Sequence, residues 1–166
     1  MRIKLNGKMN RIYNSNFEIA IRILLILRAI PSKQSSIHRL MILDHLALNT
    51  FDIGGPASLH APVPNRGVQV YSRKELIQSS IELLVSKELL EVKPTPRGIN
   101  YLISDFGIQY LTYFESKYFV LLSERVDWIS GKFGKLSEDE LNLFVKENLP
   151  KWREEFISED NLANNL

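Results

Sequence analysis

The segment from residue 71 to residue 103 constrains the fold more than any other part of the chain. It begins with a predicted helix whose apolar residues recur at helical spacing. These residues are Ile77, Ile81, Leu84 and Val85. Ser72 and Glu75 have the spacing of a capping box, which predicts that the helix begins at Ser72.

The same segment continues into a predicted β-hairpin. Residues 90–93 alternate in polarity, Pro94–Gly98 interrupts the pattern, and Ile99–Ile103 resumes it. A helix followed directly by a hairpin, after two earlier helices, is the pattern of a winged helix-turn-helix. We therefore expect a mainly α fold, with a winged helix-turn-helix-like core, a short β-hairpin wing and a C-terminal helical extension.

The two earlier helices are predicted at residues 17–30 and 37–48. The first, with N-cap candidates at residues 14–16, is apolar nearly all round, which places it in the core or partly in another subunit. Its Arg22 and Arg28 must reach solvent or a carboxylate. The second helix is capped by Ser35 or Ser36.

His38 and His45 lie seven residues apart, on one face of the second helix. Zinc requires three or four ligands, and no third ligand is evident beside them. We therefore expect surface or boundary histidines and no metal site.

A long loop is predicted at residues 49–71, and loops of this length in a small domain are usually functional or disordered. Phe51, Ile53, Leu59 and Val63 are expected to anchor it, three prolines stiffen it, and the Gly54-Gly55 pair permits a left-handed turn. The segment lacks the Lys-Ser/Thr ending of a P-loop. Ser58 and His60 do not form a catalytic pattern.

We therefore predict an ordered loop that binds a protein partner. Its candidate binding residues are Gly54, Gly55, Pro56, Ser58, Leu59, His60, Pro62, Pro64 and Arg66.

The last third of the chain is predicted to be helical and rich in aromatic residues. Residues 106–133 carry a broad apolar stripe that serves as core or as an interface, with a possible break at 115–117. Ser137 and Glu140 form a second capping box before a final helix with a kink or break at Pro150. The predicted units are a basic N-terminal arm (1–15), the winged-helix-like core (16–104), a helical extension (105–157) and a flexible tail (158–166).

The chain carries a net charge of only +2, but the charge is unevenly distributed. Residues 1–40 hold eight Lys and Arg and one acid, whereas residues 137–160 hold eight acids and three bases. This asymmetry indicates either the docking of charged surfaces or two solvated faces. The absence of cysteine and the lack of a sufficiently long apolar segment favour a cytoplasmic protein without a membrane span.

The predicted helix at 72–90 is a poor candidate for reading DNA. The face opposite its apolar residues carries Glu75 and Glu82 and no cation, whereas DNA affinity depends mainly on neutralising phosphates. Four cations near the helix start and the hairpin tip are candidates for contacts with the DNA backbone, or are solvated turn residues. They are Arg73, Lys74, Lys93 and Arg97.

Several stretches together resemble one known family. They are Asn16-Phe17-Glu18 with the apolar helix after it, Arg39–Asp44, the loop sequence Gly54–Arg66, Arg73–Ile77 and the Leu-Leu-Glu-Val of the wing. The chain resembles, from about Asn16 to Phe156, the middle component of ABC-three-component systems of the Lamassu type, which defend bacteria against phage. The loop is the most specific part of this resemblance.

The resemblance implies a small non-catalytic subunit, without a cofactor, that bridges an SMC-like ABC ATPase and an effector subunit, often a nuclease. It also implies that the complex senses foreign DNA. The alternative from the residues is a stand-alone winged-helix transcription regulator, against which Glu75 and Glu82 argue. An enzyme has the least support, because no acids, histidines or nucleophiles recur at a mechanistic spacing.

Overall fold

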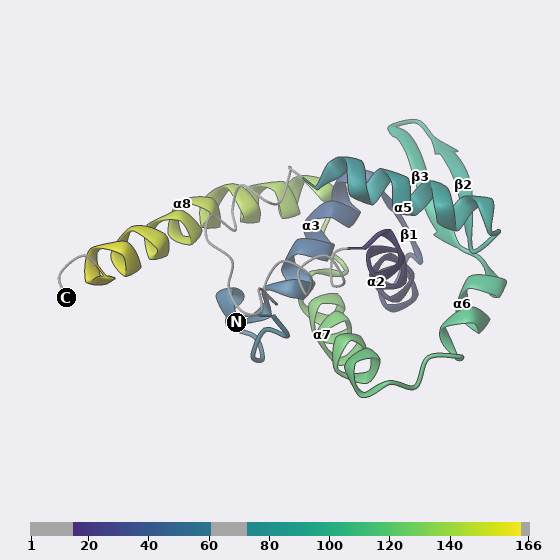
Figure 1. Cartoon of the computed structure of the whole chain (residues 1–166). Helices are drawn as coiled ribbons and strands as arrows, with labels where there is room; N and C mark the ends of the chain where they lie inside the picture. The colour runs from purple at the N-terminus through teal and green to yellow at the C-terminus, as the bar shows by residue number, and fades with distance from the viewer. Residues whose placement is uncertain (1–14, 61–72, 164–166) are drawn as a thin grey trace.

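The structure, a computed structural model, describes residues 15–60 and 73–163, with only the backbone for 153–163. Within these ranges it comprises six α-helices and a small three-stranded antiparallel sheet, so the predicted mainly α class is confirmed. Figure 1 shows α2 (Asn16–Ala29) in the middle of the molecule, and α3, α5, α6 and α7 all contact it.

Helix α2 is the core of the protein, as its apolar sequence predicts. Ser15 caps its N-terminus by accepting a hydrogen bond from the Glu18 N–H (3.3 Å). Every residue from Ile19 to Leu27 is buried. A helix that is apolar on all sides must be covered on all sides, and this is why the other helices arrange themselves around α2.

Helix α3 (Ile37–Leu48) follows a three-residue strand, β1 (Gln34–Ser36), that the sequence did not reveal. The β1 strand pairs antiparallel with β3 (Gly98–Ile103), with Ser35 opposite Tyr101. Ser36 caps α3 by accepting a hydrogen bond from the Arg39 N–H, one of the two caps predicted. Three residues are too few to show the alternation by which strands are recognised.

The predicted helix and hairpin form α5 (Lys74–Ser86) and the strands β2 (Leu90–Thr95) and β3. Ile77, Ile81 and Leu84 are buried as expected. Helix α5 begins at Lys74, after an Arg73 that makes no side-chain cap, and Ser72 of the predicted capping box lies outside the described residues. Pro96 and Arg97 form the hairpin tip, and Gly98 has a φ of 125°, which favours glycine.

The C-terminal region forms α6 (Asp105–Leu111), α7 (Lys117–Phe133) and α8 (Glu138–Ala163). The break between α6 and α7 confirms the predicted interruption near residues 115–117. The Ser137–Glu140 capping box is confirmed by reciprocal hydrogen bonds of 3.2 and 2.7 Å. None of the helices in the described ranges is both long enough and apolar enough to cross a membrane.

Of the kink or break predicted at Pro150, the break is not observed: helix α8 runs through Pro150 and continues to Ala163, into the predicted tail. Pro150 has no N–H to donate to the Lys146 carbonyl, so one hydrogen bond of the helix is missing. Both residues are exposed, so water can bind that carbonyl instead. Figure 1 shows the end of α8 extending away from the other helices.

A buried ion pair joins the central helix to its neighbours. The Arg22 side chain of α2 is 0% exposed and Asp44 of α3 is 1% exposed; Nε donates to Oδ1 at 2.6 Å and Nη2 to Oδ2 at 3.3 Å. The guanidinium of Arg73, just before α5, lies 3.2 Å from Oδ2. Asp44 thus holds α2 and the start of α5 against α3. No role for Asp44 was predicted from the sequence.

Replacing Asp44 by alanine is expected to destabilise the protein by about 3–5 kcal/mol, because two guanidinium groups lose their main counter-charge. Glu18, 3.4 Å from Arg22 Nη1, compensates only part of the loss. Urea denaturation followed by circular dichroism measures the change. The double variant Arg22→Met/Asp44→Leu should recover part of it, since it removes the fully buried guanidinium, while Arg73 remains without Asp44. An Asp44→Ala protein that unfolds at the wild-type urea concentration would contradict this prediction.

Candidate functional site

The first half of the predicted loop is an ordered structure, as expected. It begins with a 3₁₀ turn, η1 (Thr50–Ile53), and Gly54 follows with a φ of 76°, the predicted left-handed turn. The Gly55 N–H donates to the Thr50 carbonyl at 2.9 Å, and Thr50 Oγ1 donates to the Pro56 carbonyl at 2.8 Å. The Ser58 hydroxyl accepts a hydrogen bond from the Phe51 N–H. The segment therefore folds back on itself.

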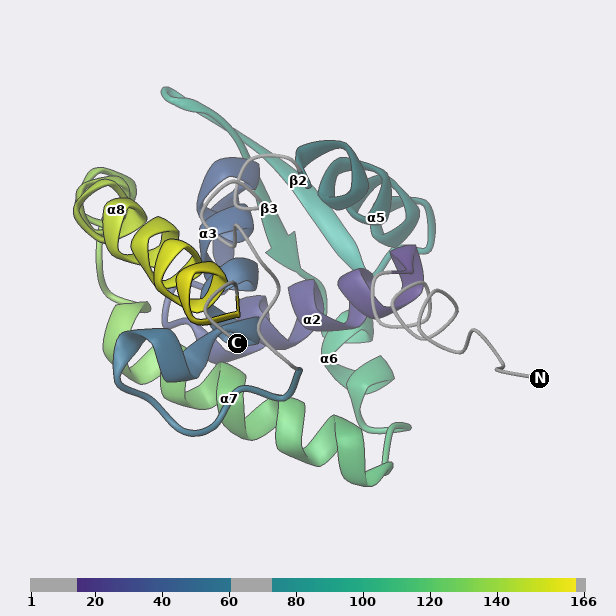
Figure 2. The ribbon, with the colours of Figure 1, turned by 60° about the vertical axis from the view of Figure 1, so that its left-hand side comes forward.

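One face of α7 fixes this loop to the protein (Figure 2). Arg125 Nε donates to the Ala57 carbonyl at 2.9 Å, and Lys132 Nζ donates to the Ile53 carbonyl at 2.8 Å. Between them, the ring of Trp128 packs against Gly55, where a Cβ atom would lie 2.7 Å from the ring. The three α7 residues follow helical spacing, so one rigid element determines the position of the loop.

The predicted loop anchors are partly right. Ile53 is buried and Leu59 packs against the core, but Phe51 is 71% exposed, so its prediction as an anchor is wrong. Its backbone is held by η1 and Ser58, which leaves the ring in solvent. Val63 and the candidate residues Pro62, Pro64 and Arg66 lie outside the described residues.

His60 connects the loop to the buried ion pair. Its Nε2 lies 2.8 Å from the Tyr118 hydroxyl, which donates to Glu18 Oε1 at 2.8 Å, and Glu18 in turn contacts Arg22. Because the Tyr118 proton is used toward Glu18, His60 must donate its Nε2 proton to the tyrosine oxygen. A chain of polar groups thus runs from the loop through α7 and α2 to Asp44.

The environment shifts the pKa values along this chain. Burial raises the pKa of Glu18, and the hydrogen bond from Tyr118 and the charge of Arg22 offset it only in part. For Asp44, burial alone would raise the pKa, but the charges of Arg22 and Arg73 outweigh it and bring the pKa below its usual value. Burial and the same two arginines lower the pKa of His60.

The four cations predicted to contact DNA differ in their exposure to solvent. Lys74, Lys93 and Arg97 are exposed, and the last two lie on the hairpin. Arg73 is bound to Asp44, and its side chain is 14% exposed. The face of α5 that carries Glu75 and Glu82 is exposed, as the helical spacing predicts.

The two histidines of α3 both contact α8. His38 Nε2 lies 2.6 Å from the Asn142 side-chain oxygen of α8. His45 is 4% exposed and its ring lies 5.5 Å from that of Trp152, so its prediction as a surface or boundary residue is wrong. In the parts of the chain that are described, no three histidine, aspartate or glutamate side chains gather as metal ligands.

Sequence reasoning missed Tyr118, Glu18 and Phe51 as site residues. A signal for Glu18 was available, because it lies four residues before Arg22 on an otherwise apolar helix, the spacing of a helical ion pair. Tyr118 lies 58 residues from His60 and 100 from Glu18, so no local pattern connects them.

The lowered pKa of His60 predicts a pH dependence of stability. Above its usual pKa of 6.5 the histidine is neutral in both states; below it the unfolded chain takes up the proton before the folded chain does. Stability should therefore decrease as the pH falls from 6.5 toward the folded pKa, and then level off.

Urea denaturation of the wild type and of His60→Gln from about pH 7.5 to about pH 5.5 measures this contribution. Both proteins retain Glu18 and Asp44, so the contributions of these carboxyl groups cancel when one pH profile of the free energy of unfolding is subtracted from the other. Glutamine keeps a side-chain donor but does not titrate. Parallel pH profiles would show that His60 has the same pKa in both states, against this prediction.

Comparison with known proteins places the chain in a family. The family model of ABC-three component (ABC-3C) system Middle Component 2 matches residues 12–155. No match was found among curated proteins or among solved structures. The matched range agrees with the resemblance seen in the sequence and includes the loop, the polar chain of groups and the hairpin. Because the match covers most of the 166 residues, the protein belongs to the ABC-three component system Middle Component 2 family.

Proposed function

We propose that this middle component is a non-catalytic adaptor that bridges an SMC-like ABC ATPase and an effector subunit, often a nuclease, in a Lamassu-type anti-phage complex of the bacterial cytoplasm. Membership of the ABC-3C family supports partners among the other components of such a system. The observation that carries the proposal is the exposed Phe51 on a loop whose backbone is fixed on both sides.

An exposed aromatic ring on a rigid support is well suited to protein binding. Aromatic side chains dominate many interfaces, and a site that is already ordered loses little conformational entropy on binding. The hydrogen bonds from Arg125 and Lys132 and the packing of Trp128 against Gly55 supply that order. We assign the loop from Gly54 onward, with Pro62, Pro64 and Arg66, to the same partner surface.

We interpret α2, β1, α3, α5, β2 and β3 as a winged-helix module used for binding proteins. This is the order of helices and strands in a winged helix-turn-helix. The exposed carboxylates of Glu75 and Glu82 on α5 would repel phosphates, which favours protein binding over major-groove reading. Any contact with DNA then occurs through the assembled complex, with the hairpin as the nearest source of cations.

Replacing Phe51 by alanine should weaken assembly of the complex without changing the stability of the isolated protein, because the ring is exposed and the loop backbone is held by other groups. We expect about a tenfold or greater loss of affinity, as for a central aromatic in an interface. Co-expression with the neighbouring ABC-3C components, followed by affinity purification and light scattering, measures it. Substitutions of His60 and Arg66 should also weaken assembly.

Tyr113→Ala is the matched control, because Tyr113 is 78% exposed but lies outside the loop. It should assemble normally. Equal recovery of the complex with Phe51→Ala and with wild type would exclude the loop ring as a binding residue.

A stand-alone DNA-binding regulator is the second candidate, favoured by the exposed Lys93 and Arg97 on the hairpin.

Changing both to glutamate should lower DNA affinity and reduce the slope of log K against log salt by about 1–2, because two phosphate contacts are lost. Lys146→Glu/Lys151→Glu, at exposed positions on α8, is the control. Specific duplex binding by the isolated protein at physiological salt would favour the regulator. Binding by the complex alone would favour the adaptor.

A further inference from the structure

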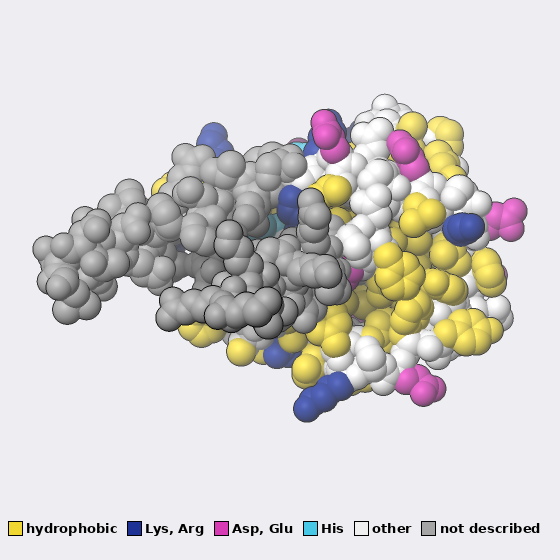
Figure 3. Space-filling model, in the orientation of Figure 1, with side chains coloured by type: hydrophobic (Ala, Val, Ile, Leu, Met, Phe, Trp, Pro, Cys, Tyr) yellow, Lys and Arg dark blue, Asp and Glu magenta, His cyan; other side chains and the backbone are white. Residues whose placement is uncertain are grey.

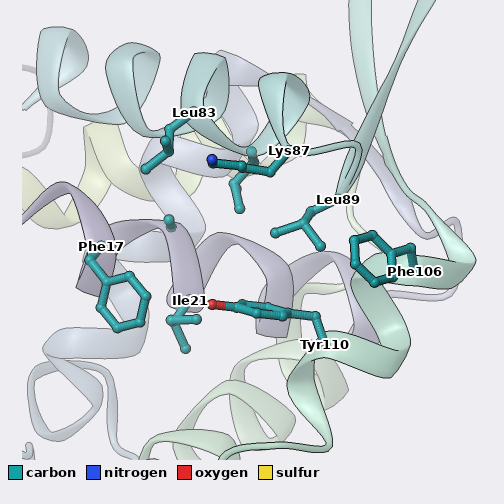
Figure 4. A pocket seen from close by; sticks show the side chains of 9 residues that line it. Phe17, Ile21, Leu83, Lys87, Leu89, Phe106 and Tyr110 are labelled. Atoms are coloured by element: carbon teal, nitrogen blue, oxygen red, sulfur yellow. The ribbon is translucent and has the colours of Figure 1, made fainter.

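An apolar groove lies between α2, α5 and α6, and none of the described loop residues lines it. It has a volume of about 360 Å³, and Phe17, Ile21, Leu83, Lys87, Phe106 and Tyr110 lie around it (Figure 4). A second hollow, of about 280 Å³, shares Phe17 and Ile21 and continues along α2 toward α7. We refer to the first as the α2–α5–α6 groove.

Three apolar side chains at the rim of this groove are exposed. Phe17 is 53% exposed, Phe106 52% and Leu83 39%, and Figure 3 shows apolar side chains gathered on this face of the molecule. Contiguous exposed apolar surface of this kind usually marks a protein-binding site. A groove that runs along helices and has aromatic rims fits the apolar face of another helix.

The charges around the groove indicate which helix it accepts. In Figure 4 the Lys87 ammonium reaches over the groove from the residue that follows α5, and the Tyr110 hydroxyl points across it from α6. Within the described residues, no carboxylate lies within ion-pair distance of Lys87 and no hydrogen bond is made by the Tyr110 hydroxyl. A carboxylate on the incoming helix would pair with Lys87, and the tyrosine would supply a second polar contact.

The same charge argues against the protein's own N-terminal segment as the occupant. Residues 1–14 contain Arg2, Lys4, Lys8 and Arg11 and no acid, so Lys87 would repel them. A partner helix with an acidic residue among its apolar ones satisfies both features of the groove.

We propose that the α2–α5–α6 groove binds an amphipathic helix of another component of the ABC-3C complex, with its apolar face on Phe17, Leu83 and Phe106 and a carboxylate on Lys87. The inference rests on the proposed adaptor function. The groove and the Phe51 loop share no lining residue, so they provide two separate binding surfaces.

The test is co-purification of the complex with two groove variants, Leu83→Asp and Lys87→Glu. Each should weaken assembly about tenfold or more, the first by placing a charge on the apolar face and the second by reversing the complementary charge. Leu143→Asp and Lys146→Glu, both at exposed positions on α8, are the matched controls and should assemble normally. Circular dichroism of each purified variant shows whether it is folded.

A zero-length amine-to-carboxylate cross-linker identifies the occupant. The expected product joins Lys87 to an Asp or Glu within a helical segment of a different component, and Lys87→Arg should assemble but lose this product. A cross-link to a second copy of this chain, or tighter assembly after removal of residues 1–14, would overturn the proposal. If wild type assembles and both groove variants assemble equally well, the groove is not the binding site. If wild type does not assemble at all, the adaptor function itself fails.

Discussion

The ion pair between Arg22 and Asp44 is the contact on which the arrangement of the helices depends. Helix α2 is surrounded by apolar groups, and a guanidinium with no exposure can be placed there only if a carboxylate accompanies it. Hydrophobic burial is non-directional, so it discriminates less sharply between rotations of a helix whose surface is apolar on nearly every side. The bidentate contact with Asp44, together with Arg73, selects one register of α2, α3 and α5. We infer that this pair contributes more to the uniqueness of the packing than to its net stability.

The same charges determine how the loop is attached. Glu18 lies one helical turn before Arg22 and receives the Tyr118 hydroxyl, which in turn accepts a hydrogen bond from His60. The other end of the loop is held independently, by the backbone contacts of Arg125 and Lys132 on α7. Helix α7 therefore supplies both attachments, so the described loop belongs to the rigid part of the protein rather than to a mobile connection.

The features that were predicted correctly from the sequence depend on interactions between residues that are close together in the chain. The helix over Ile77 to Leu84, a hairpin that turns within Pro94–Gly98, the Ser137–Glu140 cap and the left-handed Gly54 all depend on residues close together in the sequence, although the strands extend through Pro94 and Thr95, which were predicted to interrupt them. The features that were missed depend on distant partners. Strand β1 exists because β3 pairs with it, and Arg73 is bound to Asp44, which lies 29 residues before it in the sequence.

The positions of the two proposed binding surfaces bear on how an adaptor of this kind would work. The groove lies on α2, α5 and α6, and the loop lies on α7, while α2 and α7 pack directly against each other. Adjacent residues of α2 serve both sides, since Phe17 forms the rim of the groove and Glu18 belongs to the polar chain that reaches His60. Communication between the sites would require an element with two arrangements. A buried, fully charged pair at the centre opposes such rearrangement, because each alternative would leave a charge without its partner. The buried ion pair therefore favours a rigid adaptor, which would hold two partners at a fixed distance and orientation. It disfavours an adaptor that switches between two conformations.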